Sequence, residues 1–234
     1  MPRPAARVVS ALVLALVPAA ALAQNLPLAG MLPGARQPGQ AGPSTSSAGA
    51  AGAAEVGTWA EYRFRRGAEA PLRVRYSLVE RSPEGDWLET QYLRGGGTAD
   101  RLLVRVLVEG RIDRMTKQGR IKRVILQQGS MQALELPTSR GAEALPPSVP
   151  AGGPAQTIGT EALQIGDRSV VTRHVRAREG PSVTDAWVSA EVPLWGLVRF
   201  SSRRYHLELL DFGAGARSAL VGEPVRFDPT QLGR

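Results

Sequence analysis

The sequence predicts a mostly β protein built on an antiparallel sheet with few or short helices, and three observations support this. From Gly57 onward, apolar and polar residues alternate in short runs that turn residues separate. A period of two is typical of strands with one buried face. The runs recur at regular spacing, and no heptad repeat or strongly amphipathic helical run interrupts them. Such spacing indicates a sandwich, a barrel or a curved half-barrel.

The first element has the three parts of a secretory signal peptide, over residues 1–23. Two arginines precede an uncharged apolar core at 8–17, and small residues end the segment at Ala23. The alternative is an uncleaved anchor, but the apolar stretch is shorter than the roughly 20 residues that span a bilayer and contains Pro18. We expect cleavage after Ala23 and a periplasmic mature chain with no integral membrane segment.

Residues 24–56 form the second element and are rich in Ala, Gly, Pro and Ser, without an aromatic residue. A segment of this composition buries too little apolar surface to offset the entropy lost on ordering. The sequence therefore predicts a disordered tether at 24–56.

A single antiparallel β domain is predicted over 57–222. Its strands are expected at 57–66, 71–80, 86–94, 101–109, 112–117, 121–128, 169–178, 183–190, 196–202 and 204–212. The run 101–109 is apolar on both faces except at Arg105, which predicts a central strand covered on both sides.

The turns, one long loop and the tail complete the prediction. Turns are expected at 82–86, 95–97 and Gly119, and a short helix around Ser130–Leu136 is compatible with the pattern. The Pro/Gly-rich residues 137–156 predict a long loop, either a lid over a cavity or a linker between two sheets. The tail at 223–234 is expected to be irregular.

Residue types exclude most kinds of catalytic site. The chain has no cysteine, so it has no disulfide, zinc–thiolate site, thiol nucleophile or lipidated cysteine. His174 and His206 lie in strand patterns without acids at metal-ligand spacing, and neither a nucleophile elbow nor a phosphate loop occurs. We expect no catalytic residues, no metal and no cofactor. A hydrolase with dispersed acids such as Glu161, Asp167 or Asp185 is the alternative to a non-enzymatic protein.

The chain is basic, with a formal net charge of +8, or +6 once the two signal arginines are subtracted (8 − 2). Nucleic acid is not the expected partner of an exported protein, so anionic lipid headgroups or acidic envelope polymers are better candidates. A general preference for arginine as the cation would explain the same charge.

Five aromatic residues are candidate ligand-binding residues, and each lies in or beside a predicted strand: Trp59, Tyr62, Trp87, Trp187 and Trp195. One interpretation places them in the core, as expected for the few large aromatics of a sheet protein. The other places some of them along an apolar groove that holds a ligand.

Several segments resemble those of uncharacterised exported proteins: TDAWVSAEVPLWGLVRFSS (184–202), ELLDFGAGARSALVG (208–222), GTWAEYRF (57–64), WLE (87–89) and IGTEALQIG (158–166). Those proteins are similar to the lipoprotein-localisation (Lol) factor superfamily. The resemblance implies an incomplete β-barrel, in which a curved antiparallel sheet surrounds an apolar cavity for acyl chains. The tether, and the lack of the lipidated cysteine of the outer-membrane receptor, depart from that family.

The resemblance and the residues together imply a periplasmic, non-enzymatic protein that holds a lipid, acyl chain or other apolar ligand on the concave face of its sheet. The alternative is a structural component of an envelope assembly, whose sheet docks a protein partner while the tether supplies reach.

Overall fold

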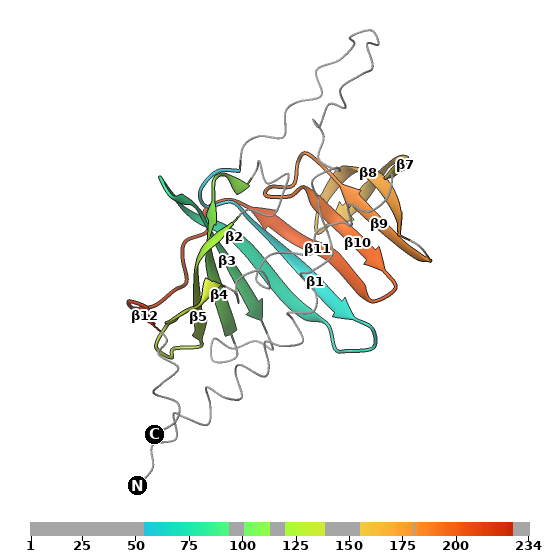
Figure 1. The fold of residues 1–234 in the computed structure, drawn as a ribbon. Helices are drawn as coiled ribbons and strands as arrows, with labels where there is room; N and C mark the ends of the chain where they lie inside the picture. Colours follow the sequence, from blue (N-terminus) through green and yellow to red (C-terminus); the bar gives the residue numbers. More distant parts are fainter. Residues whose placement is uncertain (1–53, 94–100, 113–119, 139–154, 180, 227–234) are drawn as a thin grey trace.

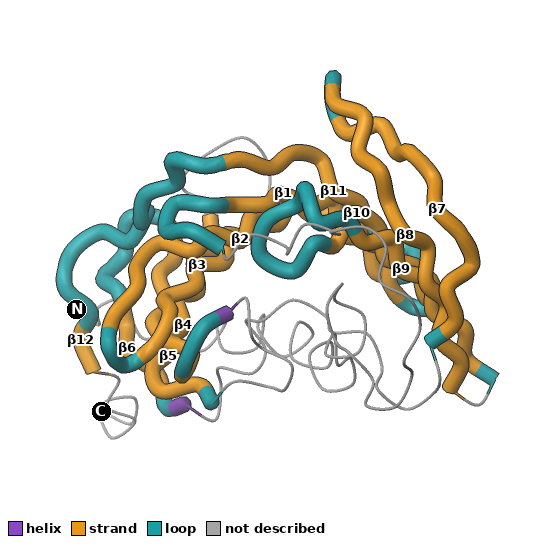
Figure 2. The backbone as a smooth tube through the Cα atoms, turned by 90° about the horizontal axis from the view of Figure 1, so that it is seen from above, coloured by secondary structure: helices purple, strands orange, loops and turns teal. Residues whose placement is uncertain are grey.

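The structure is a computed structural model, and it describes residues 54–93, 101–112, 120–138, 155–179 and 181–226. These residues form one open, curved sheet of twelve strands, as Figures 1 and 2 show. The strands are β1 (Trp59–Arg66), β2 (Leu72–Ser82), β3 (Gly85–Leu93), β4 (Arg101–Glu109), β5 (Ile121–Gln128), β6 (Leu134–Leu136), β7 (Gln156–Ile165), β8 (Arg168–Glu179), β9 (Ser182–Val188), β10 (Leu197–Ser202), β11 (Tyr205–Gly213) and β12 (Val225–Arg226). The predicted fold class, a mostly β curved antiparallel sheet, is confirmed.

The sheet consists of two meanders joined in the middle. Its order is β12-β6-β5-β4-β3-β2-β1-β11-β10-β9-β8-β7, so β1 to β6 and β7 to β11 each follow chain order. The antiparallel pair β1–β11 joins the two halves, from Trp59 opposite Gly213 to Arg66 opposite Tyr205. Every neighbouring pair is antiparallel except β12–β6, which is parallel.

The main core lies on the concave face. Alternate residues of the strands point there, and the β9–β10 connection adds Val192, Leu194 and Trp195 to the same cluster. The cluster includes Ala60, Tyr62, Val74, Leu78, Leu88, Val106, Val124, Ala186, Phe200 and Leu207. The apolar and polar residues that alternate in the sequence therefore lie on opposite faces of this sheet.

A smaller core lies on the convex face of β3 to β5. Trp87, Leu107, Ile125 and Ala133 form it, and Leu220 packs against it. Residues 214–224, which follow β11, run across this face before β12, and we call them the C-terminal strap. Because β4 contributes Leu107 here and Val106 to the concave core, the prediction of a strand covered on both faces is confirmed.

Three local expectations differ from the structure. Residues 134–136 form β6 rather than part of a helix, since Leu134 and Leu136, two apart, face Leu126 and Val124 across the sheet. The tail is not wholly irregular, because β12 pairs with β6. Ala54 is buried in the concave core, so the folded part begins before Gly57.

Other expectations fall on residues outside the described ranges. These are the signal peptide at 1–23, most of the tether, the turn at 95–97, most of the predicted strand 112–117 with Gly119, most of the loop 137–156, and the end of the tail. In the described part of the chain, no helix has the length and apolar character needed to cross a membrane.

Candidate anion-binding site

Two of the five candidate aromatic residues lie in the concave core. The Tyr62 hydroxyl donates a hydrogen bond of 2.9 Å to the carbonyl oxygen of Leu197, and burial raises the pKa of Tyr62 well above its ordinary value. Trp195 meets the ring of Tyr76 edge-on, with ring centroids 5.2 Å apart. Tyr62 and Trp195 are both almost completely buried, so they fill the core rather than line an open surface.

By strand alternation the other three project from the opposite, convex face, each under an arginine guanidinium, and Trp187 also packs against the main core. The guanidinium carbon lies 4.4 Å from the ring centroid in the Arg75–Trp59 pair, 4.6 Å in the Arg105–Trp87 pair and 5.4 Å in the Arg199–Trp187 pair. The five aromatics are thus divided between opposite faces and do not line one groove. Cation–π stacking on a polar sheet face is a role that sequence reasoning did not consider.

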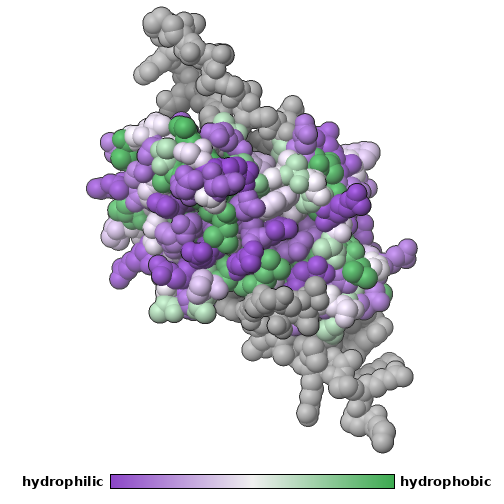
Figure 3. Space-filling model, turned by 180° about the vertical axis from the view of Figure 1, so that it is seen from behind, coloured by the Kyte–Doolittle hydropathy of each residue, from purple (hydrophilic) through white to green (hydrophobic). Residues whose placement is uncertain are grey.

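Charged residues connect the strands of the convex face into a network. His174 stacks on Trp187 with ring centroids 4.2 Å apart, and its Nε2 lies 2.7 Å from Asp185 Oδ1, which also accepts a hydrogen bond of 2.8 Å from Arg176. The Trp187 indole N–H donates to Glu161. Figure 3 shows this face, where hydrophilic residues predominate.

The balance of effects on Asp185 indicates a structural role. Partial burial acts to raise the pKa of this carboxyl, but hydrogen bonds from Arg176 and His174 outweigh it and hold the pKa below its ordinary value. A carboxylate held in its ionised form by such hydrogen bonds is a poor general acid. Within the described ranges, no group of three His, Cys, Asp or Glu residues could hold a metal ion.

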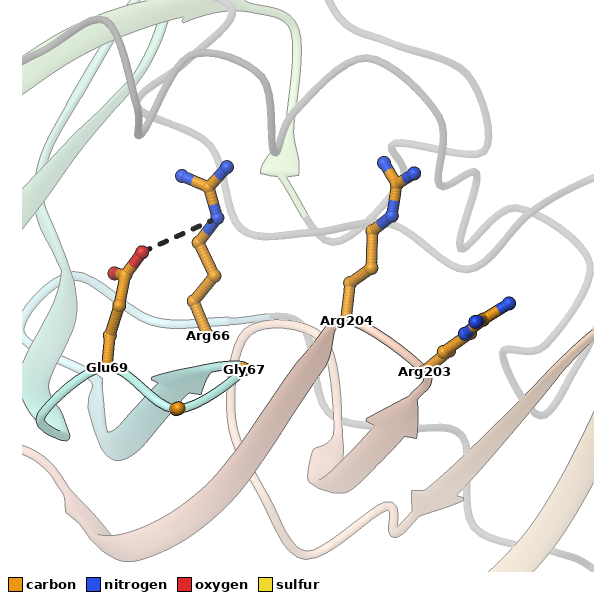
Figure 4. Close-up of a pocket in the computed structure, with 6 residues that line it drawn as sticks. Arg66, Gly67, Glu69, Arg203 and Arg204 are labelled. Atoms are coloured by element: carbon orange, nitrogen blue, oxygen red, sulfur yellow. Dashed lines mark ion pairs between the residues drawn. The ribbon is translucent and has the colours of Figure 1, made fainter.

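A pocket of different character lies at one end of the sheet, where the β1–β2 and β10–β11 turns meet. Its volume is about 530 Å³, and it is lined by Arg66, Gly67, Ala68, Glu69, Arg203 and Arg204. The Gly67 N–H donates a hydrogen bond of 3.0 Å to the carbonyl oxygen of Arg204, which joins the two turns. Gly67 has φ +52°, a backbone conformation that glycine adopts at no steric cost. Figure 4 shows Arg66 and Arg204 extending side by side from these turns.

The pocket is strongly cationic. Its side chains carry three guanidinium groups and one carboxylate, a balance of +2 (3 − 1). Arg66 Nε lies 3.9 Å from Glu69 Oε1, a loose and exposed ion pair. Neither Arg203 nor Arg204 forms an ion pair with another residue of the described ranges. Planar guanidinium forks match the oxygens of phosphate and carboxylate groups, so the pocket suits an anion.

Apolar side chains continue from the pocket onto the concave face. Arg66 is opposite Tyr205 in the sheet, and Phe64 is two residues before Arg66, so the three side chains share a face. The rings of Phe64 and Tyr205 stack with centroids 6.2 Å apart, and Leu72 lies opposite Phe64. Phe64, Leu72 and Tyr205 are only partly buried, and we call them the apolar lip of the concave face.

Sequence reasoning missed this site. Its signal is two Arg-Arg pairs, 65–66 and 203–204, each at or beside the boundary of a predicted strand. The pairs are far apart in the chain, and only the β1–β11 register brings them together. No candidate residue predicted from the sequence lies in the pocket.

No family model matches the chain, and no curated protein matches it. Among solved structures, similarity is found to a protein described as a putative lipoprotein from Parabacteroides distasonis, with 11% identity, a TM-score of 0.30, and coverage of 69% of this chain and 97% of that one. PNGF-II matches with 6% identity, a TM-score of 0.29, and coverage of 75% of this chain and 31% of that one.

Proposed function

We propose that this chain is a non-enzymatic binding protein of the bacterial envelope that holds an anionic amphiphile such as a lipid. The anionic group would occupy the pocket formed by Arg66, Arg203 and Arg204, and the acyl chains would lie along the apolar lip. The observation that carries the proposal is that a cationic pocket adjoins partly buried aromatic side chains on the concave face.

The two parts of such a ligand would be held by different forces. Hydrogen bonds from guanidinium groups to an anion contribute about 1.5–3 kcal/mol each, because the acceptor is charged. Apolar surface removed from water contributes roughly 25 cal/mol per Å². A free anion gains only the first contribution and a neutral lipid only the second, so an anionic amphiphile is the ligand that uses the whole site.

Binding is favoured over catalysis by the side chains in the pocket. Arginine stays protonated in proteins and does not act as a general base near neutral pH. Glu69 is exposed to solvent, and the two turns supply no nucleophilic side chain to the pocket. The groups present can therefore orient and neutralise an anion, and this supports a binding role.

The test measures the binding affinity of short-chain lipids that stay monomeric by isothermal titration calorimetry. We expect dihexanoyl phosphatidylglycerol to bind more tightly than dihexanoyl phosphatidylcholine, and inorganic phosphate to bind more weakly than either. The double variant Arg203→Gln/Arg204→Gln should lose at least about tenfold in affinity for the anionic lipid, since two charge-assisted contacts are removed.

The matched control is Arg178→Gln/Arg217→Gln, which removes the same charge from exposed positions outside the pocket. This control should bind the anionic lipid as the unaltered chain does. Equal affinity for the two lipids, or an equal loss of affinity in both double variants, would contradict the proposal.

A further inference from the structure

The two edges of the sheet differ in length. At one edge the chain ends the sheet with β6 and β12, which have three and two residues. At the other edge lies β7, with ten residues, and only β8 pairs with it. Figure 2 shows β7 at the end of the curved sheet with no strand beyond it. One side of β7 therefore presents backbone N–H and C=O groups that no described strand satisfies.

The residues of β7 do not block pairing at this edge. Exposed edge strands usually carry lysine, proline or inward-pointing charges that prevent association. In β7 there is no lysine and no proline, and Glu161 is its only charged residue. The carboxylate of Glu161 is already bound by the Trp187 indole N–H. From Gly159 to Ile165 the register with β8 is regular, so these seven residues form a straight template.

We propose that β7 pairs antiparallel with β7 of a second copy of this chain, about a two-fold axis at Ala162. A two-fold axis perpendicular to a sheet places each residue opposite one of the same face, so the axis lies midway between the two copies of one residue. An axis at Glu161 would set two carboxylates opposite each other. An axis at Ala162 uses the whole regular stretch and pairs Glu161 with the second copy's Leu163.

The side chains fit this register. Ala162 lies opposite Val171 in the β7–β8 pair, and Val171 is 57% exposed, one of the most exposed large apolar side chains described. The proposed pairing joins Val171 and Ala162 of both copies into one apolar row across four strands. In the next row, Thr160 meets Gln164 of the second copy, and both have polar side chains that can hydrogen-bond.

A closed dimer is favoured over an open series of copies because the edge formed by β6 and β12 is short. Strands β6 and β12 offer too little backbone for a matching contact, so the assembly closes as a dimer and does not extend into a fibre. The arginine pocket is formed by the β1–β2 and β10–β11 turns, and β7 contributes no residue to it. The inference is thus independent of the proposed function.

The test combines solution mass with charge reversal at the axis. Light scattering should give the purified chain twice the mass of one copy at tens of micromolar. In Ala162→Lys, and likewise in Ala162→Glu, two like charges would face each other, which should weaken the dimer by at least about tenfold. An equimolar mixture of the two variants should restore a dimer. The control Ala214→Lys adds a charge at an exposed position away from β7 and should remain dimeric.

Hydrogen exchange supplies a measurement that needs no variant. Amides within Gly159–Ile165 should exchange more slowly at high protein concentration than at low concentration, while β11 should show no change. A monomer at 100 µM, a dimer that both charge variants leave intact, or exchange in β7 that is independent of concentration would each overturn the proposal.

Discussion

Two glycines meet where the β2–β3 turn approaches the end of β4. Gly85 has φ +149° and forms an isolated bridge with Gly110, which has φ +82°. A Cβ added at Gly85 would lie 1.9 Å from the carbonyl oxygen of Val108, whereas a Cβ at Gly110 would meet nothing within 4 Å. Both positions have positive φ, but only Gly85 lacks room for a Cβ. Alanine substitutions at the two positions therefore distinguish the cost of backbone strain from the cost of a steric clash.

We therefore predict that Gly85→Ala destabilises the protein far more than Gly110→Ala. Gly110→Ala should cost about 1–2 kcal/mol, the usual penalty for a side chain at positive φ. Gly85→Ala should cost about 3 kcal/mol or more, because β4 must also move away. Urea unfolding followed by tryptophan fluorescence measures both, and equal costs would contradict the steric explanation.

For the aromatic residues, the sequence predicts which face of a strand they occupy but not which residues they contact. Trp59 and Trp87 lie in alternating runs that place them on the face opposite Tyr62, yet their arginine partners come from neighbouring strands. The arginine pocket is harder to predict, since Arg66 and Arg204 meet only through a pairing between the first and eleventh strands. Local pattern carries no information about that pairing.

Among the elements, β8 and β9 are joined by the hydrogen bonds that connect Asp185 with Arg176 and His174. The folded pKa of Asp185 is below its ordinary value of 3.8, so the ionised carboxylate contributes stability above that pH. The contribution is lost as the pH falls through the lower folded pKa, when the carboxylate takes up a proton. Glu135, whose pKa is lowered chiefly by its hydrogen bond with Arg123, acts in the same direction between β5 and β6.

For the variant Asp185→Asn we predict a loss of about 1–2 kcal/mol at pH 7, because hydrogen bonds to a charged acceptor become hydrogen bonds to a neutral one. Below pH 3.8 the difference from the unaltered chain should shrink. The measurement is the free energy of unfolding in urea between pH 2.5 and pH 7. A constant difference across this range would show that Asp185 acts through its shape and not its charge.

Element boundaries show where sequence prediction works and where it fails. The predicted strand 121–128 coincides with β5, because alternation and flanking turn residues both mark it. The pattern near Ser130–Leu136 is compatible with a short helix, but residues 134–136 form β6. A strand of three residues is too short to show a period, and its pairing depends on Leu126 and Val124 across the sheet. Tertiary pairing decides such short segments.

For the molecule as a whole, the C-terminal strap completes the convex face. Glu89 is fully buried and accepts hydrogen bonds from the Ser218 hydroxyl and the Ala219 N–H. Gln127 exchanges two hydrogen bonds with the backbone of Val221. The strap thus adds hydrogen bonds to two buried polar side chains of the sheet, beyond those that Glu89 accepts from Gln91 and Gln127 donates to the Met131 carbonyl oxygen.

Neighbouring residues of the strap give a matched prediction. Leu220 packs on the convex core, whereas the side chain of Val221 is 62% exposed. Leu220→Ala should therefore cost about 1.5–2 kcal/mol and Val221→Ala less than about 0.5 kcal/mol. Chemical denaturation of the two variants gives the comparison, and similar costs would mean that the strap does not cover the core through Leu220.

The pairing of β1 with β11 also dictates an order of events during folding. Each meander can form from contacts close in sequence, but the edge of β1 stays open until the eleventh strand has been synthesised. Closing that gap is the long-range step, and contacts of high sequence separation slow folding. The nascent chain therefore has an interval in which Tyr62 and Phe64 lie at an uncovered sheet edge, and during this interval the protein is most exposed to aggregation and to the action of chaperones.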